Sequence, residues 1–358
     1  MNHTQMNAPN RVPAADGDFT WYLTPWAQQR PGSGTRDIVF VNGAATPAEV
    51  HKKVAFILSD IIEGNVLGIY NQTGTLNGWS FSQFIRNVRN DPVLGQYTIL
   101  VPGTDVAAGA VNTAVDGVVG LWNATTGQSQ TAPQAAPIKA DLRIPLTATL
   151  EALAAVEGLP LDVIVDVGQL CADWGRIMLA LQVEPTPVGQ FLRANPLLVR
   201  RLIEIFFIDN VAVRELIAFL DENIWGDGVV PIVCHSQGNL VVASAMHGLA
   251  VLRNYRLPRA IKIYAVASPV PGWPTVTPLV VRNYVNALDW APLFSLGASY
   301  TTNANFGVWK GGFMQVHDLE PYIANTDFNK ELRRDLGLPP PPQRPTNSML
   351  GVRRVPNF

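Results

Sequence analysis

The chain has 358 residues, enough for one large α/β domain with insertions or for two small domains. Apolar residues make up 47% and charged residues only 15%, so the chain can bury a large core and still expose apolar surface. The formal net charge of −2 excludes a general attraction to nucleic acid or anionic membranes, and no nucleic-acid partner is expected.

The cysteines and the N-terminus indicate the cellular compartment in which the protein is expected. Cys171 and Cys234 lie in apolar segments without metal-ligand spacing, so we expect no disulfide framework, no metal site and a reducing environment. Met1–Phe19 lacks the apolar core of a secretory signal, which favours a cytoplasmic location and leaves export by a signal-independent route open. The longest weakly polar run, 107–122, contains Asp116 and is too short to span a bilayer, so no transmembrane segment is expected.

The pattern of apolar runs and turn residues divides the chain into a lead-in, a core in two parts, an insertion and a tail. The predicted boundaries are 1–36 for the lead-in, 37–72 and 228–336 for the core, 73–227 for the insertion and 337–358 for the tail. The proline-rich tail is expected to be disordered or polyproline-like.

The first core segment predicts a β-α-β unit. Apolar runs at 38–41 and 66–70 are typical of strands buried on both faces of a parallel sheet. Between them, Thr46, Pro47 and Glu49 have the spacing of a helix start with a capping box. The apolar face of that helix is predicted to consist of Val50, Val54, Ile57, Leu58 and Ile61. Such a unit predicts a right-handed crossover and a parallel sheet.

The insertion begins with a segment, 102–140, that is rich in Ala, Gly, Thr and Pro and is predicted to be loop. Its second half predicts apolar helices at 161–182, 188–208 and 211–225. The middle one is apolar on all sides, which is typical of a helix that is buried or faces an apolar partner. The insertion is therefore either a substrate-binding cap or additional core.

The second core segment returns to alternating strands and helices. Strands are predicted at 229–234, 261–267, 279–286 and 306–309, and a helix at 240–252. Pro231 is unfavourable inside a central strand because it has no N–H to donate, although it is tolerated at a strand's beginning.

Ser236 lies where the first of these strands meets the helix, the position of a nucleophile on a sharp strand-to-helix turn. Such a turn leaves little room for side chains two residues before and two residues after the serine. Gly238 occupies the second of these positions and Cys234 the first, where glycine is more common. Because cysteine is small, the turn is still expected to form.

A histidine and a carboxylate complete the predicted triad. The window 237–317 contains one carboxylate, Asp289, where composition alone would place roughly six. Of the histidines, only His317 follows the last predicted strand, where a loop can bring it above the serine; the others are His3, His51, His235 and His247. Serine, acid and histidine in this order match the nucleophile, orienter and base of α/β-hydrolases. Asp318 and Glu320 are the fallback acids.

The tetrahedral oxyanion of acyl transfer needs preorganised backbone donors. One is expected to be the amide of Gln237, directly after the serine. The other is expected in the turn after the first strand, at Gly43 or Ala44, where glycine permits a close approach. The alternative is an ordinary βα turn.

Several short motifs resemble those of known hydrolases. Residues His235–Asn239 resemble the serine turn of bacterial lipase-like α/β-hydrolases. Similarity to fungal-type (class 3) lipases extends over Ala267–Pro271, Tyr284–Asp289 and His317–Tyr322, and Val41–Thr46 resembles the oxyanion-side turn of the superfamily. The resemblance covers about 36–72 and 228–325 and implies ester hydrolysis by Ser236, Asp289 and His317.

The resulting expectation is a three-layer α/β-hydrolase with a mostly parallel central sheet and a largely helical cap insertion. Its reaction would be hydrolysis of lipid-like acyl esters through an acyl-enzyme, without cofactor or metal. The expected partner is a small-molecule or lipid ester substrate, with transient contact at a membrane surface left open, as is the oligomeric state. Alternatives are a phospholipase or acyltransferase, including a secreted effector, and an inactive hydrolase-fold binding module.

Overall fold

The computed structural model describes residues 9–24, 37–44, 46–72, 211–221, 229–253, 256–270, 273–274, 276–286, 289, 291–292, 305–306, 317–324 and 326–340. The predicted loop at 102–140, the predicted helices at 161–182 and 188–208, and the tail beyond 340 lie outside these residues. The proposed cap therefore lies outside them too, apart from the helix that ends it.

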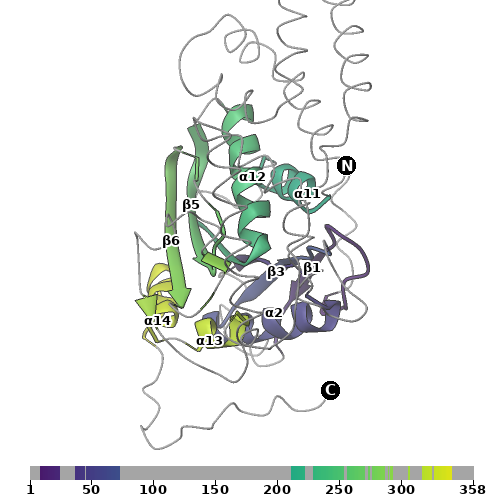
Figure 1. The fold of residues 1–358 in the computed structure, drawn as a ribbon, viewed down its shortest axis with the longest axis vertical. Coiled ribbons are helices and arrows are strands. Elements are labelled where there is room, and N and C mark those ends of the chain that lie inside the picture. The colour runs from purple at the N-terminus through teal and green to yellow at the C-terminus, as the bar shows by residue number, and fades with distance from the viewer. Residues whose placement is uncertain are drawn as a thin grey trace, which may run out of the picture.

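The described residues form a mixed α/β fold around a seven-stranded sheet in the order β1-β3-β2-β4-β5-β6-β7 (Figure 1). The strands are β1 Phe19–Tyr22, β2 Asp37–Val41, β3 Asn65–Ile69, β4 Val230–His235, β5 Arg256–Val266, β6 Thr277–Asn286 and β7 Asn305–Phe306. All neighbouring pairs are parallel except β1 and β3. The predicted mostly parallel sheet is confirmed.

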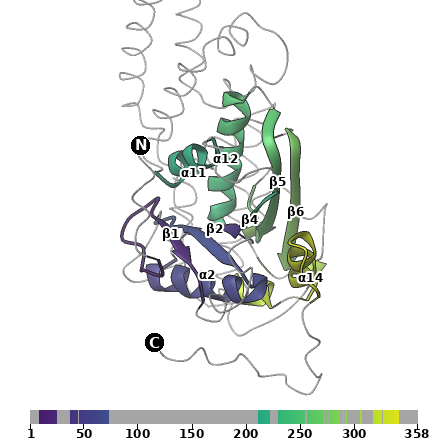
Figure 2. The same cartoon turned by 180° about the vertical axis from the view of Figure 1, so that it is seen from behind.

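The antiparallel strand β1 was not predicted, because it falls in the segment interpreted as a lead-in. It pairs with β3, with Phe19 opposite Ile69, and lies at the edge of the sheet away from β6 (Figure 2). The preceding Asp16 accepts a hydrogen bond of 2.8 Å from the backbone N–H of Gln72 and others from the first residues of α11. The N-terminal segment thus connects the residue that precedes the insertion to the first residues of α11.

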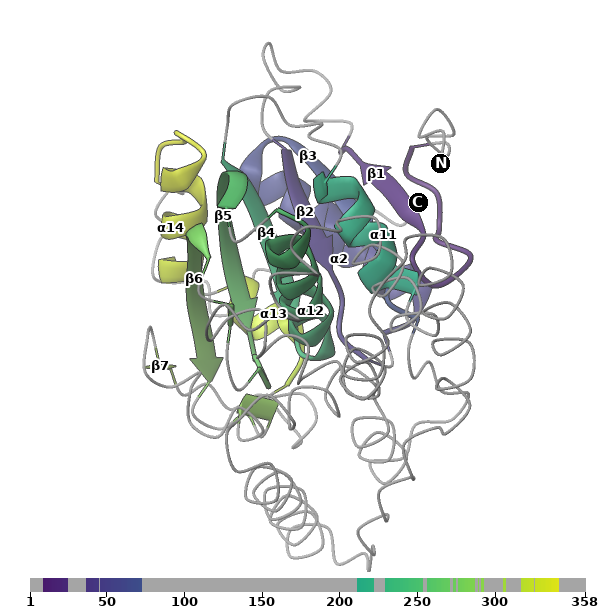
Figure 3. The same cartoon turned by 90° about the horizontal axis from the view of Figure 1, so that it is seen from above.

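Helices cover both faces of the sheet (Figure 3). The five helices of the described residues are α2 Ala48–Ile62, α11 Val211–Asp221, α12 Gln237–Leu252, α13 Leu319–Ile323 and α14 Thr326–Asp335. Helices α11 and α12 pack together on one face, while α2, α13 and α14 lie on the other. Within the described ranges, no helix is long and apolar enough to cross a membrane.

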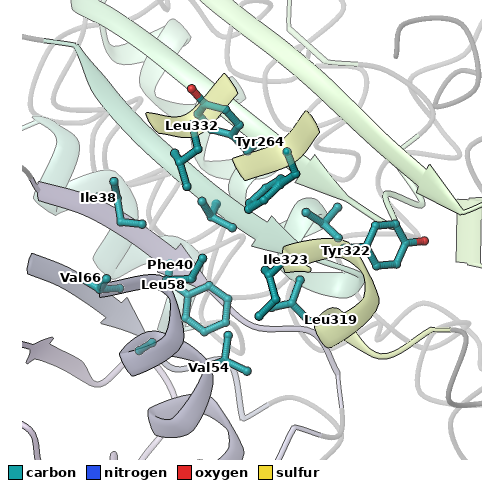
Figure 4. Close-up of a cluster of buried hydrophobic side chains, with 14 of the residues drawn as sticks. Ile38, Phe40, Val54, Leu58, Val66, Tyr264, Leu319, Tyr322, Ile323 and Leu332 are labelled. Atoms are coloured by element: carbon teal, nitrogen blue, oxygen red, sulfur yellow. The ribbon is translucent and has the colours of Figure 1, made fainter. Parts of the chain in front are cut away.

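A buried hydrophobic cluster joins the sheet to α2, α13 and α14 (Figure 4). Phe40 of β2 and Tyr264 of β5 meet Leu58 of α2 and Leu332 of α14 there, all almost completely buried. Burial of each such side chain contributes about 1.5–3 kcal/mol. The cluster therefore holds α2, α13 and α14 against the sheet, and with them the loop that carries His317.

Polar contacts complete the attachment of α14. Asp335 accepts a hydrogen bond of 2.5 Å from the Tyr264 hydroxyl and lies 3.0 Å from Arg282 and 3.3 Å from Lys262. Burial alone would raise the pKa of Asp335, but the tyrosine hydroxyl and the two cations outweigh it and lower that pKa. The ionised carboxylate thus fastens the helix to β5 and β6.

The start of α2 differs from the prediction. Its N-cap is Pro47 and makes no side-chain cap hydrogen bond, so the expected capping box does not form. Thr46 instead donates its hydroxyl backwards to the carbonyl of Gly43, at 2.9 Å. The buried face is also shifted: Val50 is 43% exposed, whereas His51 is fully buried. The face is shifted by a tertiary contact, because the His51 ring forms a hydrogen bond with Asn42 below the helix.

Pro231 lies inside β4, a strand flanked by β2 and β5. It is opposite Lys262 of β5, but the pairing of β4 with β2 begins only at the next residue, Ile232, opposite Val39. Pro231 therefore lies at the margin of the ladder with β2, where its missing N–H costs least.

Candidate active site

Ser236 occupies a single-residue turn between β4 and α12. Its φ of +51° is in the left-handed region, which non-glycine residues adopt rarely and at a cost of about 1–2 kcal/mol. The backbone N–H of Ser236 donates to the carbonyl of Val266 at 3.0 Å, which ties the turn to β5. Helix α12 begins directly after the serine, three residues earlier than predicted.

A buried asparagine, Asn239, stabilises this turn from the first turn of α12. Its Nδ2 donates to the carbonyls of Ser236, at 2.9 Å, and of Val266, at 2.8 Å. Its Oδ1 accepts a hydrogen bond of 3.1 Å from the thiol of Cys234. Burial raises the pKa of this thiol well above its ordinary value, so it stays protonated and donates. Cysteine at the position usually held by glycine therefore contributes to the turn.

Two glycines allow the turn after β2 to approach the serine turn. A Cβ on Gly43 would lie 2.8 Å from Cβ of Ser236, and a Cβ on Gly238 would lie 2.6 Å from the backbone oxygens of Val41 and Asn42. Real Cβ atoms essentially never approach so closely. Both positions therefore require glycine for the two turns to pack.

The structure brings the three predicted triad residues together. Nε2 of His317 lies 2.7 Å from Oγ of Ser236, and Nδ1 lies 2.9 Å and 3.1 Å from the two carboxylate oxygens of Asp289. All three side chains are buried. Because Nδ1 faces the carboxylate it carries the ring proton, which leaves Nε2 free to accept the serine proton.

The carboxylate of Asp289 is held by two further donors. The Tyr322 hydroxyl donates to Oδ2 at 2.6 Å, and the backbone N–H of Ala291 donates to Oδ1 at 2.9 Å. The same tyrosine oxygen accepts the N–H of Asn286, at the end of β6, at 3.1 Å. Tyr322 thus links the loop that carries the acid to the helix that follows the histidine.

The histidine beside the serine, His235, supports the loop of His317 from below. Its Nε2 lies 2.8 Å from the backbone carbonyl of His317, and the two ring centroids are 5.0 Å apart. Burial, together with the neighbouring His317, lowers the pKa of His235 to about 3. A neutral His235 donates its Nε2 proton to the carbonyl and places no positive charge beside His317.

The predicted oxyanion donors lie around Ser236. Gln237 is the first residue of α12, and Gly43 packs on the serine, with Ala44 following in the same turn. The side chain of Gln237 is buried as well, and neither of its amide atoms has a hydrogen-bond partner within the described part of the chain. These positions can supply backbone N–H groups to an anionic oxygen on the serine's substrate.

Sequence reasoning missed the supporting residues Asn239, Tyr322 and His235. All three lie inside motifs that carry the hydrolase resemblance, His235–Asn239 and His317–Tyr322, which is the one available signal for them. Of the fallback acids, Asp318 is exposed, and the side chain of Glu320 lies outside the described residues. Among the residues that the structure describes, no group of three or more His, Cys, Asp or Glu side chains could hold a metal ion.

Comparison of the chain with protein-family models, with curated proteins and with solved structures gave no match. The catalytic roles of Ser236, His317 and Asp289 stay predictions, supported by the geometry of the site.

Proposed function

We propose that this protein is a serine hydrolase of the α/β-hydrolase fold that cleaves carboxylic esters. One observation carries the proposal: the continuous series of hydrogen bonds from Ser236 Oγ through His317 to Asp289. A serine hydroxyl is a poor nucleophile at neutral pH and needs a base within hydrogen-bond reach and a group that orients the base. A mostly parallel sheet with the serine on a strand-to-helix turn supports the proposed fold.

In the proposed reaction, Oγ of Ser236 attacks the ester carbonyl carbon while Nε2 of His317 accepts the hydroxyl proton. The imidazolium then returns this proton to the leaving oxygen as its bond to the acyl carbon breaks, which releases the alcohol and leaves the acyl group on the serine. Water attacks the acyl carbon while His317 accepts one of its protons, and the bond from the acyl carbon to Oγ then breaks as the imidazolium returns the proton to Oγ. The carboxylic acid departs and the serine hydroxyl is restored. Asp289 holds the imidazole in the required tautomer and stabilises the imidazolium.

A fluorophosphonate probe tests the nucleophile directly, because it phosphonylates activated serine hydroxyls. We predict that the folded protein is labelled and that Ser236→Ala is not. Ser244→Ala is the matched control: this serine is buried in α12, outside the site, so its variant should label like the wild type. Labelling is measured by gel fluorescence and peptide mass mapping on samples with equal circular dichroism.

Two outcomes of this experiment contradict the proposal. One is an unlabelled wild-type protein, which favours a binding module that retains hydrolase-like geometry. The other is equal labelling of the wild type and Ser236→Ala, which moves the nucleophile elsewhere.

The proposed substrates are esters with a long, lipid-like acyl chain. Support comes from composition, since the insertion at 73–227 is rich in apolar residues and pockets for apolar ligands are lined by such side chains. Nitrophenyl esters of increasing acyl length should therefore show kcat/KM rising with length. Cleavage of short acyl esters far faster than long ones would refute this substrate class.

Tyr322 is proposed to position the acid that orients His317. Removing its hydroxyl in Tyr322→Phe should lower kcat about tenfold with little change in KM, because a hydrogen bond to a charged group contributes about 1.5–3 kcal/mol. The matched control is Tyr264→Phe, which removes a hydroxyl bonded to the remote carboxylate of Asp335 and should keep the wild-type kcat. Equal losses in the two variants would show that both act through stability alone.

A further inference from the structure

The turn that follows β2 is held by a buried asparagine whose hydrogen-bonding capacity is fully used. Nδ2 of Asn42 donates to the carbonyls of Gly43, at 2.9 Å, and Asn71, at 2.8 Å. Oδ1 accepts the N–H of Asn71, at 2.9 Å, and Nδ1 of His51, at 2.8 Å. Since an amide side chain has two N–H donors and two acceptor sites, Asn42 is fixed in one orientation.

His51 fixes Asn42 from the helix above. Burial lowers the pKa of His51 to about 3, so the ring is neutral and its Nδ1 proton is directed at Asn42. The ring stacks on Phe40, with centroids 5.0 Å apart. Gly68 of β3 provides the space for it, because a Cβ there would lie 2.4 Å from the histidine Nε2. The histidine therefore cannot turn away from the asparagine.

The carbonyl of Gly43 receives two hydrogen bonds. One comes from Asn42 Nδ2 and the other from the hydroxyl of Thr46, each at 2.9 Å. Thr46 is itself held by the Tyr70 hydroxyl, which donates to its carbonyl at 3.0 Å. Because a trans peptide directs its C=O and N–H to opposite sides, fixing the Gly43 carbonyl also fixes the N–H of Ala44.

The side of this turn that faces the serine is defined by Gly43, whose Cα packs on Ser236 and His235. We infer that Asn42, Thr46 and His51 form a clamp that holds the Ala44 N–H as the second oxyanion donor, beside the N–H of Gln237. The inference rests on the proposed function and deepens it. Of the two donors that the sequence leaves open, Gly43 and Ala44, it selects Ala44 and assigns Gly43 the role of spacer.

The clamp matters only when negative charge develops on the substrate oxygen. Loss of an oxyanion donor costs about 10²–10³ in kcat, and a donor that stays in place but loses its fixed orientation costs less. Such a donor acts in the transition state and not in substrate binding, so its disturbance should lower kcat and leave KM unchanged. A lower kcat with an unchanged KM therefore distinguishes a positioning role from a general loss of stability.

Thr46→Val removes one arm of the clamp while keeping the size of the side chain, and Thr46→Ser restores the hydroxyl. We expect Thr46→Val to lower kcat about tenfold with KM unchanged, and to weaken binding of an alkyl boronic acid, which forms a tetrahedral adduct on the serine, by a similar factor. Thr46→Ser should recover most of both. Melting curves show whether each variant is folded, and Thr46→Ala replaces Thr46→Val if the latter is not.

The possible results separate this inference from the proposed function. An active wild type with unchanged kcat and boronic acid affinity in Thr46→Val overturns the clamp alone. Equal losses in Thr46→Val and Thr46→Ser overturn it too, because the hydroxyl would then not be the active group. A wild-type protein that neither hydrolyses esters nor reacts with fluorophosphonate overturns both.

Discussion

The hydrogen bond between Ser236 Oγ and His317 Nε2 is the interaction on which the proposed chemistry depends. It joins residues 81 positions apart, and it forms because both follow strands whose carboxyl ends share one edge of the sheet. Asp289 reaches the same edge from the end of β6. A parallel arrangement of β4, β5 and β6 is thus the structural requirement, and the apolar core beneath α2, α13 and α14 maintains it.

The serine turn combines local strain with compensating contacts. The left-handed φ of Ser236 costs about 1–2 kcal/mol. Two hydrogen bonds from Asn239 and the backbone bond to Val266 offset it, since each contributes about 0.5–1.5 kcal/mol. The opposing turn approaches closely because Gly43 and Gly238 lack side chains. Strain at this point exposes the hydroxyl to the imidazole, and the surrounding contacts keep it there.

The sequence was sufficient to predict the parallel strands and the three residues that meet at the sheet edge. Apolar runs mark buried strands, and elimination within one window singles out Asp289 and His317. Strand β1 was not predicted, because it is stabilised by pairing with β3, a segment distant in the sequence. Thr46 matched a capping box, in which its hydroxyl would accept a hydrogen bond from the start of the helix, yet the hydroxyl donates to the Gly43 carbonyl instead. The roles of Tyr322 and His235 depend on contacts over 33 and 82 positions, which no local pattern specifies.

The most direct test of Ser236 as the nucleophile is to trap the acyl-enzyme intermediate. The protein is mixed rapidly with a nitrophenyl ester and quenched with acid, and its peptides are mapped by mass spectrometry. The acyl mass is expected on the peptide containing Ser236 before steady state is reached, and it is expected to be absent in Ser236→Ala. Ester turnover with the acyl group on another residue, or with no acylated peptide at any time, would contradict it.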